Sequence, residues 1–371
     1  MRLNIVAGVR PNLMKIAPIL RALAEARVRG AGMTVRLVHT GQHFDRNLCE
    51  CLLEQLEMPT PHAFLEARGE THARQTADIM TRFEAELMAN RPDMVMVVGD
   101  VNSTLACALA AKKLCLPLAH VEAGLRSGDR NMPEEINRIA TDSISDYFFT
   151  TGQTADRHLL REGIPADRIF TVGNTMADTL LYNLPRARKP EFWDSAGLQQ
   201  GRFLVLTIHR PENADNPARI QAILDALAAR CGDRLPIVWP AHPRLNPHTL
   251  SLPAGLLLLP PLGYLEFLYL LTHCLAVVSD SGGVSEEATV LRKPCIVLRR
   301  VTERPETLES GACTLADADP RAIQNALDRL FTGDWPIAPP PPLWDGKAGA
   351  RIADALERIA LTRSTLNPRY R

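Results

Sequence analysis

The sequence predicts an α/β protein made of two Rossmann-like, doubly wound domains that face a cleft. Three observations predict this fold class. The chain has 371 residues, more than one typical domain of roughly 100–200 residues. Short, continuously apolar runs alternate with amphipathic segments, which is typical of buried parallel strands joined by helices. This alternation occurs twice, on either side of a polar stretch that contains prolines.

The first series of apolar runs begins close to the N-terminus. Parallel strands are expected at residues 3–7, 35–39, 94–98 and 116–121. After the first run, apolar residues recur every three or four positions from Leu13 to Ala24, which predicts a helix with one face on the sheet. The second series predicts strands at residues 203–207, 237–239, 256–259, 276–279 and 295–298.

The domain boundaries follow from the segments between and after these series. Residues 183–200 contain two prolines and several charges, as a connection between domains does. We therefore expect an N-terminal domain at 1–180 and a C-terminal domain at 181–350. The apolar positions Ile352, Leu356 and Ile359 predict a last helix within 351–371, which could pack back on the N-terminal domain.

Composition excludes several classes of protein. The 42 Lys+Arg balance the 42 Asp+Glu, and no basic run favours nucleic acid. No apolar stretch approaches the roughly 20 residues of a membrane-spanning helix, and the N-terminus has no secretory pattern, so we expect a cytoplasmic protein. The eight cysteines are scattered without metal-ligand spacing, which favours reduced thiols and no metal site.

Charged residues follow the predicted strands of the first half. In open parallel sheets, ligands bind beyond the carboxyl ends of the strands. Arg10 and Lys15 flank a helix start where a phosphate group could bind, although a purely structural turn is the open alternative. Asp100 and Glu122 each follow a strand and should face one cleft. Glu134 begins another helix, where capping is the alternative role.

The second half offers histidines and a glycine-containing helix start. His209 and His242 each follow a predicted strand, where a structural histidine is the alternative. Residues 281–283 join the strand 276–279 to a helix, so their backbone N–H groups could hold a diphosphate. A carboxylate further along this helix could accept hydrogen bonds from sugar hydroxyls; stabilisation of the helix dipole is the alternative.

Taken together, these segments resemble the non-hydrolysing UDP-N-acetylglucosamine 2-epimerases, which have the two-domain glycosyltransferase-B fold. The resemblance is carried by residues 8–11 with Lys15, 99–100, 120–126, 133–138, 173–175, 209–210, 280–287 and 302–306. These segments span most of the chain in the family's order. The commonest form of the first motif reads Gly-Thr-Arg-Pro-Glu, and Val9 and Asn12 depart from it here.

The resemblance implies roles for individual residues. The acid and base candidates are Asp100, Glu122 and Glu134. The resemblance also implies that His209, Lys15 and Arg138 take part in the reaction. It implies a substrate-binding set of Arg10, His242, Ser281, Gly282, Gly283, Glu287 and Arg304. Ser281, Gly282 and Gly283 would hold the diphosphate, Glu287 the ribose, and Arg10, His209 and Arg304 the phosphate charge. No metal, no cofactor and a homodimer are expected from this resemblance.

The implied reaction is reversible epimerisation at carbon 2, which interconverts UDP-N-acetylglucosamine and UDP-N-acetylmannosamine for a surface polysaccharide. The hydrogen on carbon 2 is hardly acidic, so departure of UDP must assist its removal. Elimination and re-addition of UDP, with protonation on the opposite face, would invert carbon 2. Two alternatives stay open: a glycosyltransferase of the same fold that uses a UDP-sugar donor, and a non-catalytic UDP-sugar sensor.

Overall fold

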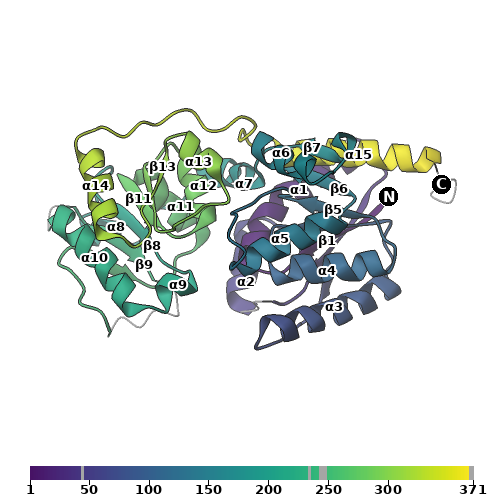
Figure 1. The fold of residues 1–371 in the computed structure, drawn as a ribbon, viewed down its shortest axis with the longest axis horizontal. Helices are drawn as coiled ribbons and strands as arrows, with labels where there is room; N and C mark the ends of the chain where they lie inside the picture. Colours follow the sequence, from purple (N-terminus) through teal and green to yellow (C-terminus); the bar gives the residue numbers. More distant parts are fainter. Residues whose placement is uncertain (43–45, 233–234, 242–248, 367–371) are drawn as a thin grey trace. The chain divides into compact units, whose positions relative to one another are not determined.

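The computed structural model describes residues 1–42, 46–232, 235–241 and 249–366. The chain forms two compact units. Unit 1 comprises Met1–Leu181 and Pro342–Arg371, and unit 2 comprises Tyr182–Pro341. Each is an α/β unit with one parallel sheet (Figure 1). The prediction of two doubly wound α/β domains is therefore confirmed.

The sheet of unit 1 has the order β3-β2-β1-β4-β5-β6-β7, and every neighbouring pair is parallel. Its strands are β1 (Arg2–Ala7), β2 (Thr34–His39), β3 (Ala63–Phe64), β4 (Met94–Val98), β5 (Leu118–Val121), β6 (Tyr147–Thr150) and β7 (Ile169–Thr171). The chain moves outward from β1 in one direction and then restarts at β4 on its other side. The strand order reverses between β1 and β4, and such sheets bind ligands in the crevice beyond the strand ends at that point.

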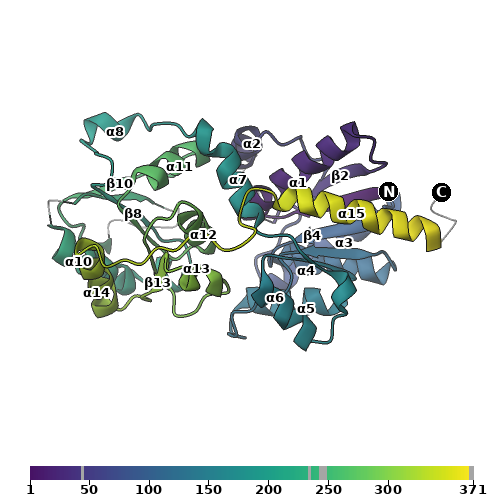
Figure 2. The ribbon, with the colours of Figure 1, turned by 90° about the horizontal axis from the view of Figure 1, so that it is seen from above.

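Helices cover both faces of this sheet. They are α1 (Arg10–Val28), α2 (Arg46–Gln55), α3 (His72–Ala89), α4 (Asn102–Lys113), α5 (Pro133–Ile144), α6 (Gln153–Arg161), α7 (Thr175–Asn183) and α15 (Ala348–Leu366). Figures 1 and 2 both show α15 lying alongside α1, although the two are far apart in sequence. Ile352, Leu356 and Ile359 are buried, so the apolar stripe of α15 packs on unit 1.

The sheet of unit 2 repeats the same topology, with the order β10-β9-β8-β11-β12-β13. Its strands are β8 (Leu204–Thr207), β9 (Ile237–Pro240), β10 (Leu256–Leu259), β11 (Ala276–Ser279), β12 (Cys295–Val297) and β13 (Cys313–Leu315). The crevice here lies beyond β8 and β11. The helices are α8 (Phe192–Ser195), α9 (Pro211–Ala214), α10 (Pro217–Cys231), α11 (Tyr264–His273), α12 (Gly282–Val290), α13 (Pro305–Glu309) and α14 (Pro320–Phe331).

The strands predicted from apolar runs are all present, with small shifts at their ends. The run at 116–121 becomes a strand only from Leu118, and β10 is half-buried because it is the edge of its sheet. The short strands β3, β6, β7 and β13 were not predicted. Each contains at most one aliphatic residue, so none forms the aliphatic run that marks the other strands. Within the described ranges, no helix combines the length and apolar character needed to cross a membrane.

Candidate active site

The turn after β1 is tied to the end of β4 by Asn12. Its Oδ1 accepts hydrogen bonds from the backbone N–H groups of Gly8 and Val9 at 3.1 Å, and its Nδ2 donates to the carbonyl of Val98 at 2.9 Å. A glutamate, the commoner residue here in the resembled family, has no such donor. Asn12 therefore braces both loops of the unit 1 crevice.

Gly8 is required by a close contact within unit 1. A Cβ atom there would lie 2.2 Å from Ser103 Oγ and 2.5 Å from Ser103 Cβ. What approaches the backbone of Gly8 is thus a side chain from the start of α4. The need for glycine is a packing requirement, and it carries no information about phosphate binding.

Lys15 and Glu122 form an ion pair beside Gly99. Their side chains are largely buried, and Lys15 Nζ contacts Glu122 Oε2. A Cβ on Gly99 would be 3.3 Å from Lys15 Nζ and 3.5 Å from Glu122 Oε2, so both groups lie against the residue that precedes Asp100. Glu122 has a φ of 69°, a conformation that is strained for a residue with a side chain. Such strain is common at functional positions.

Asp100 is bonded to the buried guanidinium of Arg138. Arg138 Nη1 contacts Asp100 Oδ2, while Nε and Nη2 donate to Glu135 Oε2 at 2.9 and 2.7 Å. Asn137 Nδ2 donates to the carbonyl of Asp100 at 2.9 Å. The carboxylate of Asp100 stays 26% exposed, so a ligand can reach it.

The neighbouring acids Glu134 and Glu135 differ completely in environment. Glu135 is buried and also accepts the N–H groups of Ser127 and Gly128 at 2.9 and 3.0 Å. Burial tends to raise the pKa of Glu135, but these N–H groups and the Arg138 guanidinium outweigh it and hold the pKa below its usual range. Glu134 is half-buried and makes no hydrogen bond or ion pair with any residue that the structure describes. Glu134 is therefore the acid of the two that can act on a ligand.

A buried histidine links the two acid-bearing loops. His120 Nε2 lies 2.9 Å from the carbonyl of Gly99, and its Nδ1 lies 2.7 Å from Asp142 Oδ1. Asp142 also accepts from Gly124 N and Arg126 Nη1. Burial acts to raise the pKa of Asp142, but His120 and Arg126 hold it low. His120 lies within the motif at residues 120–126, but nothing in the spacing of that motif predicts its contact with Asp142.

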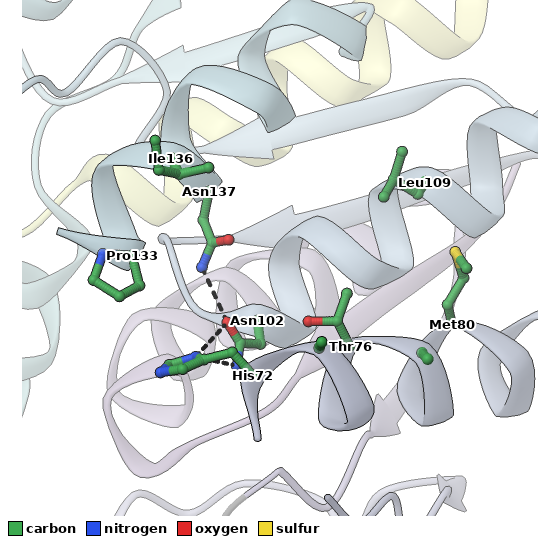
Figure 3. Close-up of a pocket in the computed structure, with 10 residues that line it drawn as sticks. His72, Thr76, Met80, Asn102, Leu109, Pro133, Ile136 and Asn137 are labelled. Carbon is green, nitrogen blue, oxygen red and sulfur yellow. Dashed lines mark hydrogen bonds between the residues drawn. The ribbon is translucent and has the colours of Figure 1, made fainter. Parts of the chain in front are cut away.

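A cavity of about 490 Å³ lies between α3, α4 and α5 (Figure 3). Met80, Leu109, Pro133 and Ile136 give it a mainly apolar lining. None of the predicted site residues lines it, so we do not assign the substrate to it. Its polar wall is Asn137, which the close-up shows bonded to Asn102 and which also holds the backbone of Asp100.

In unit 2, His209 is held by Asp280. Asp280 follows β11 and is fully buried, and its Oδ1 lies 2.7 Å from His209 Nδ1. The carboxylate also accepts the backbone N–H groups of His209 and Arg210 and the Nδ2 of Asn213 at 3.0–3.2 Å. Burial alone would raise the pKa of Asp280, but these donors lower it. His209 itself stays 44% exposed.

The N-terminus of α12 begins directly after Asp280. Ser281 caps the helix by accepting from Val284 N at 3.4 Å. A Cβ on Gly282 would lie 2.9 Å from Glu303 Oε1, and Glu303 forms a 2.7 Å ion pair with Arg299. Glycine thus lets a buried Glu–Arg pair pack against the start of the helix. Ser281, Gly282 and Gly283 are each partly exposed, as an anion site requires.

Two further predicted residues have buried partners. Arg304 Nε contacts Glu286 Oε1, and both side chains are buried, so Arg304 already has a counter-charge within unit 2. Glu287 accepts a 3.0 Å hydrogen bond from the hydroxyl of Tyr264. Burial, opposed by the Tyr264 hydrogen bond and helped by the Glu286 charge, raises the pKa of Glu287 to about 8. Burial thus favours the protonated form of the Glu287 carboxyl.

Comparison with known proteins places the chain in a family. The sequence model described as UDP-N-acetylglucosamine 2-epimerase matches residues 26–357. The chain belongs to the UDP-N-acetylglucosamine 2-epimerase family. The resemblance inferred from the motifs is thereby confirmed.

Individual members of the epimerase family match along nearly the whole chain. The UDP-N-acetylglucosamine 2-epimerase of Methanocaldococcus jannaschii is 40% identical, covering 96% of this chain and 99% of that protein. Its crystal structure in complex with UDP-GlcNAc and UDP has a TM-score of 0.83 at 37% identity, covering 96% of this chain and all of that one. The UDP-2,3-diacetamido-2,3-dideoxy-D-glucuronate 2-epimerase of Pseudomonas aeruginosa is 38% identical, covering 97% of this chain and all of that protein.

A more distant structure bears on the fold alone. A glycosyltransferase from Streptomyces nogalater has a TM-score of 0.53 at 16% identity, covering 97% of this chain and all of that one. The epimerase fold of this chain is therefore shared with glycosyltransferases, as the glycosyltransferase-B-like prediction stated.

The predicted site residues of this epimerase family member fall into two groups. Unit 1 brings together Lys15, Asp100, Glu122 and Arg138, with Glu134 on the same helix as Arg138. Arg10 is exposed at the start of α1. Unit 2 places His209 beside the start of α12 through Asp280, and His242 lies outside the described residues. In the part of the chain described, no cluster of His, Cys, Asp or Glu has the arrangement to hold a metal ion.

Proposed function

We propose that this protein catalyses the reversible epimerisation of UDP-N-acetylglucosamine at carbon 2, giving UDP-N-acetylmannosamine for a surface polysaccharide. One observation carries the proposal beyond family membership. Asp100 and Glu122 are carboxylates at neighbouring strand ends, each ion-paired to a buried or nearly buried cation, with Glu134 lacking any partner among the described side chains. Two acids after neighbouring strands and a third on the helix that carries Arg138 suit proton transfer on both faces of a sugar.

In this proposal the catalytic acids belong to unit 1 and the nucleotide site belongs to unit 2. Unit 1 handles the sugar through Asp100, Glu122 and Glu134. Unit 2 binds UDP, with the backbone N–H groups of residues 281–283 on the diphosphate and Glu287 on the ribose. His209, Arg10 and Arg304 reduce the charge on the phosphates, and His242 supports them.

The reaction proceeds by elimination and re-addition. The bond between carbon 1 and the UDP oxygen breaks with its electron pair leaving on UDP, and a carboxylate removes the hydrogen from carbon 2 as a proton. This leaves a double bond between carbons 1 and 2. A second acid then protonates carbon 2 from the opposite face, and the retained UDP adds back to carbon 1. Lys15 and Arg138 orient the carboxylates of Glu122 and Asp100.

Electrostatic stabilisation of departing UDP supplies the larger part of the acceleration, because preorganised donors at a helix N-terminus cost no reorganisation during the reaction. The acids contribute typically ~10²–10⁴-fold. Glu122 is held at a positive φ by its fold, which fixes its carboxylate beside Lys15. That rigidity favours Glu122 as one of the two proton-transfer groups.

Exchange in deuterated water tests the proposal. Recovered UDP-N-acetylhexosamine should carry deuterium at carbon 2, detected by NMR and mass spectrometry. Asp100→Asn and Glu122→Gln should each reduce the exchange rate at least ~10²-fold. Asp146→Asn is the matched control, because Asp146 is a partly exposed carboxylate paired with Lys112 on the same unit. No exchange with any UDP-sugar in the panel would refute the proposal.

The substrate panel must include UDP-2,3-diacetamido-2,3-dideoxy-D-glucuronate, because a relative of that name is 38% identical to this chain. Preference for this sugar would change the substrate and keep the reaction. Dependence on a sugar acceptor, with the carbon 2 hydrogen retained, would indicate a glycosyltransferase. Binding without turnover would indicate a sensor.

The quaternary state and location complete the proposal. Two copies form a homodimer, as the family resemblance implies, and light scattering of the purified protein tests this. The protein acts in the cytoplasm, where its nucleotide-sugar substrate would be used. The free thiols of the seven cysteines with described side chains fit a reducing compartment.

A further inference from the structure

We propose that Asp280 is a positioning residue that fixes His209 with its Nε2 directed at the nucleotide diphosphate. The inference rests on the proposed function, because it assumes that the start of α12 holds the diphosphate. It adds a residue for which the motifs gave no role. Asp280 itself is fully buried and touches no substrate.

The geometry around Asp280 fixes both the loop and the ring of His209. Two backbone N–H groups of the loop after β8 donate to the carboxylate, from His209 at 3.1 Å and from Arg210 at 3.1 Å. The ring nitrogen Nδ1 of His209 lies 2.7 Å from Oδ1. Asn213 Nδ2 donates to Oδ2 at 3.0 Å and to the carbonyl of Leu298 at 3.2 Å, which links the carboxylate to the residue after β12.

This arrangement decides which nitrogen of His209 carries a proton. An ionised carboxylate only accepts hydrogen bonds, so Nδ1 must be the protonated nitrogen. The other nitrogen, Nε2, is left to meet a ligand, and the side chain is 44% exposed. When Nε2 also binds a proton, Asp280 balances the resulting charge. His209 can then donate a charge-assisted hydrogen bond to a phosphate oxygen as UDP departs.

The position of Asp280 in the sequence explains how one residue can hold both the loop of His209 and the start of α12. It lies between the last residue of β11 and the Ser281 cap of α12, and β11 pairs with β8. Asp280 therefore joins the loop that carries His209 to the helix start that faces the diphosphate. Displacement of one moves the other.

Other charged groups surround this pair. Arg210 lies on the same loop, 4.0 Å from Glu212 of α9. Arg219 of α10 reaches Asn213 Oδ1 at 3.0 Å and Asp317 at 2.5 Å. On the opposite side, the Arg299–Glu303 ion pair packs against Gly282. Among the described residues of unit 2, Asp280 is the one with a hydrogen bond or ion pair to the imidazole ring.

A double-mutant cycle separates positioning from simple support of the loop. Asp280→Asn should lower kcat/KM for epimerisation about 10²-fold. His209→Asn keeps a short donor toward Asp280 but lacks Nε2. In that background, Asp280→Asn should have little further effect, because the nitrogen that it positions is gone. Equal losses in both backgrounds would mean that Asp280 only holds the loop, and would overturn the proposal.

A further readout depends on the imidazole alone. Nitrogen-15 spectra of the wild-type protein should show His209 protonated on Nδ1; protonation on Nε2 with a bare Nδ1 would overturn the proposal even if the variant fails to fold. Asp317→Asn, a half-exposed carboxylate on the same unit, is the matched control.

The experiment distinguishes this proposal from the proposed function. If the wild-type protein exchanges no hydrogen at carbon 2 of any UDP-sugar, the epimerase proposal fails. The same cycle is then measured on the Kd for UDP, together with the nitrogen-15 spectrum. Loss of UDP affinity in Asp280→Asn that disappears in the His209→Asn background would still support positioning. Additive losses would refute it.

Discussion

Replacement of Glu135 by glutamine should destabilise unit 1, although its neighbour Glu134 tolerates the same change. Glu135 bonds two backbone N–H groups and two nitrogens of Arg138, whose side chain is 2% exposed. Removal of one partner from a buried ion pair costs about 3–5 kcal/mol. Asp100 still neutralises Arg138, so the lower end, about 3 kcal/mol, applies.

Differential scanning calorimetry measures this effect. A loss of about 3 kcal/mol should lower the Tm of the unit 1 transition by about 6–12 °C. Glu134→Gln is the matched control for stability, since no described residue bonds to it; its Tm should stay within ~2 °C, because surface changes cost about 0.5 kcal/mol or less. The same control should lose carbon 2 exchange. If Glu135→Gln melts with the wild type, or if both variants melt early, the separation of a structural and a chemical acid is wrong.

Three more changes have defined outcomes. Gly8→Ala should cost about 1–3 kcal/mol in urea unfolding, because its Cβ would overlap Ser103, whereas Gly32→Ala, with open space around it, should be neutral. Burial raises the pKa of Asp178 to about 6. The protonated carboxyl therefore contributes fully to the free energy of unfolding below pH 3.8, and this contribution, on the order of 3 kcal/mol, is lost as the pH rises through 6. Asp178→Asn should flatten the dependence of the free energy of unfolding on pH in this range. Because the pKa of Glu287 is about 8, Glu287→Gln should leave the calorimetric Kd for UDP nearly unchanged at pH 6.5. The variant should bind UDP more weakly than the wild type only above pH 8. An equal loss of affinity in Glu287→Gln and Glu287→Ala at pH 6.5 would contradict a protonated Glu287.

The sequence by itself determined the two-domain α/β architecture and the family resemblance. A buried parallel strand must be apolar on both faces. The strands β1, β4, β8 and β11 can therefore be predicted from continuous apolar runs without knowledge of their neighbours. Their carboxyl ends then fix where functional loops must lie. Strands such as β3 and β13, which contain a single aliphatic residue each, give no such run and are defined by pairing with a neighbour.

Only the tertiary structure decided what each charged residue does. Glu134 and Glu135 are the same residue type at one helix start. The carboxylate of Glu135 accepts hydrogen bonds from Arg138 and two backbone N–H groups, whereas that of Glu134 does not. Asp280 looked like part of a glycine-containing turn until folding placed it against His209, 71 residues away. The physical reason is that local pattern reports burial of backbone segments, whereas the partner of a polar side chain depends on which distant loop the topology brings within hydrogen-bond reach.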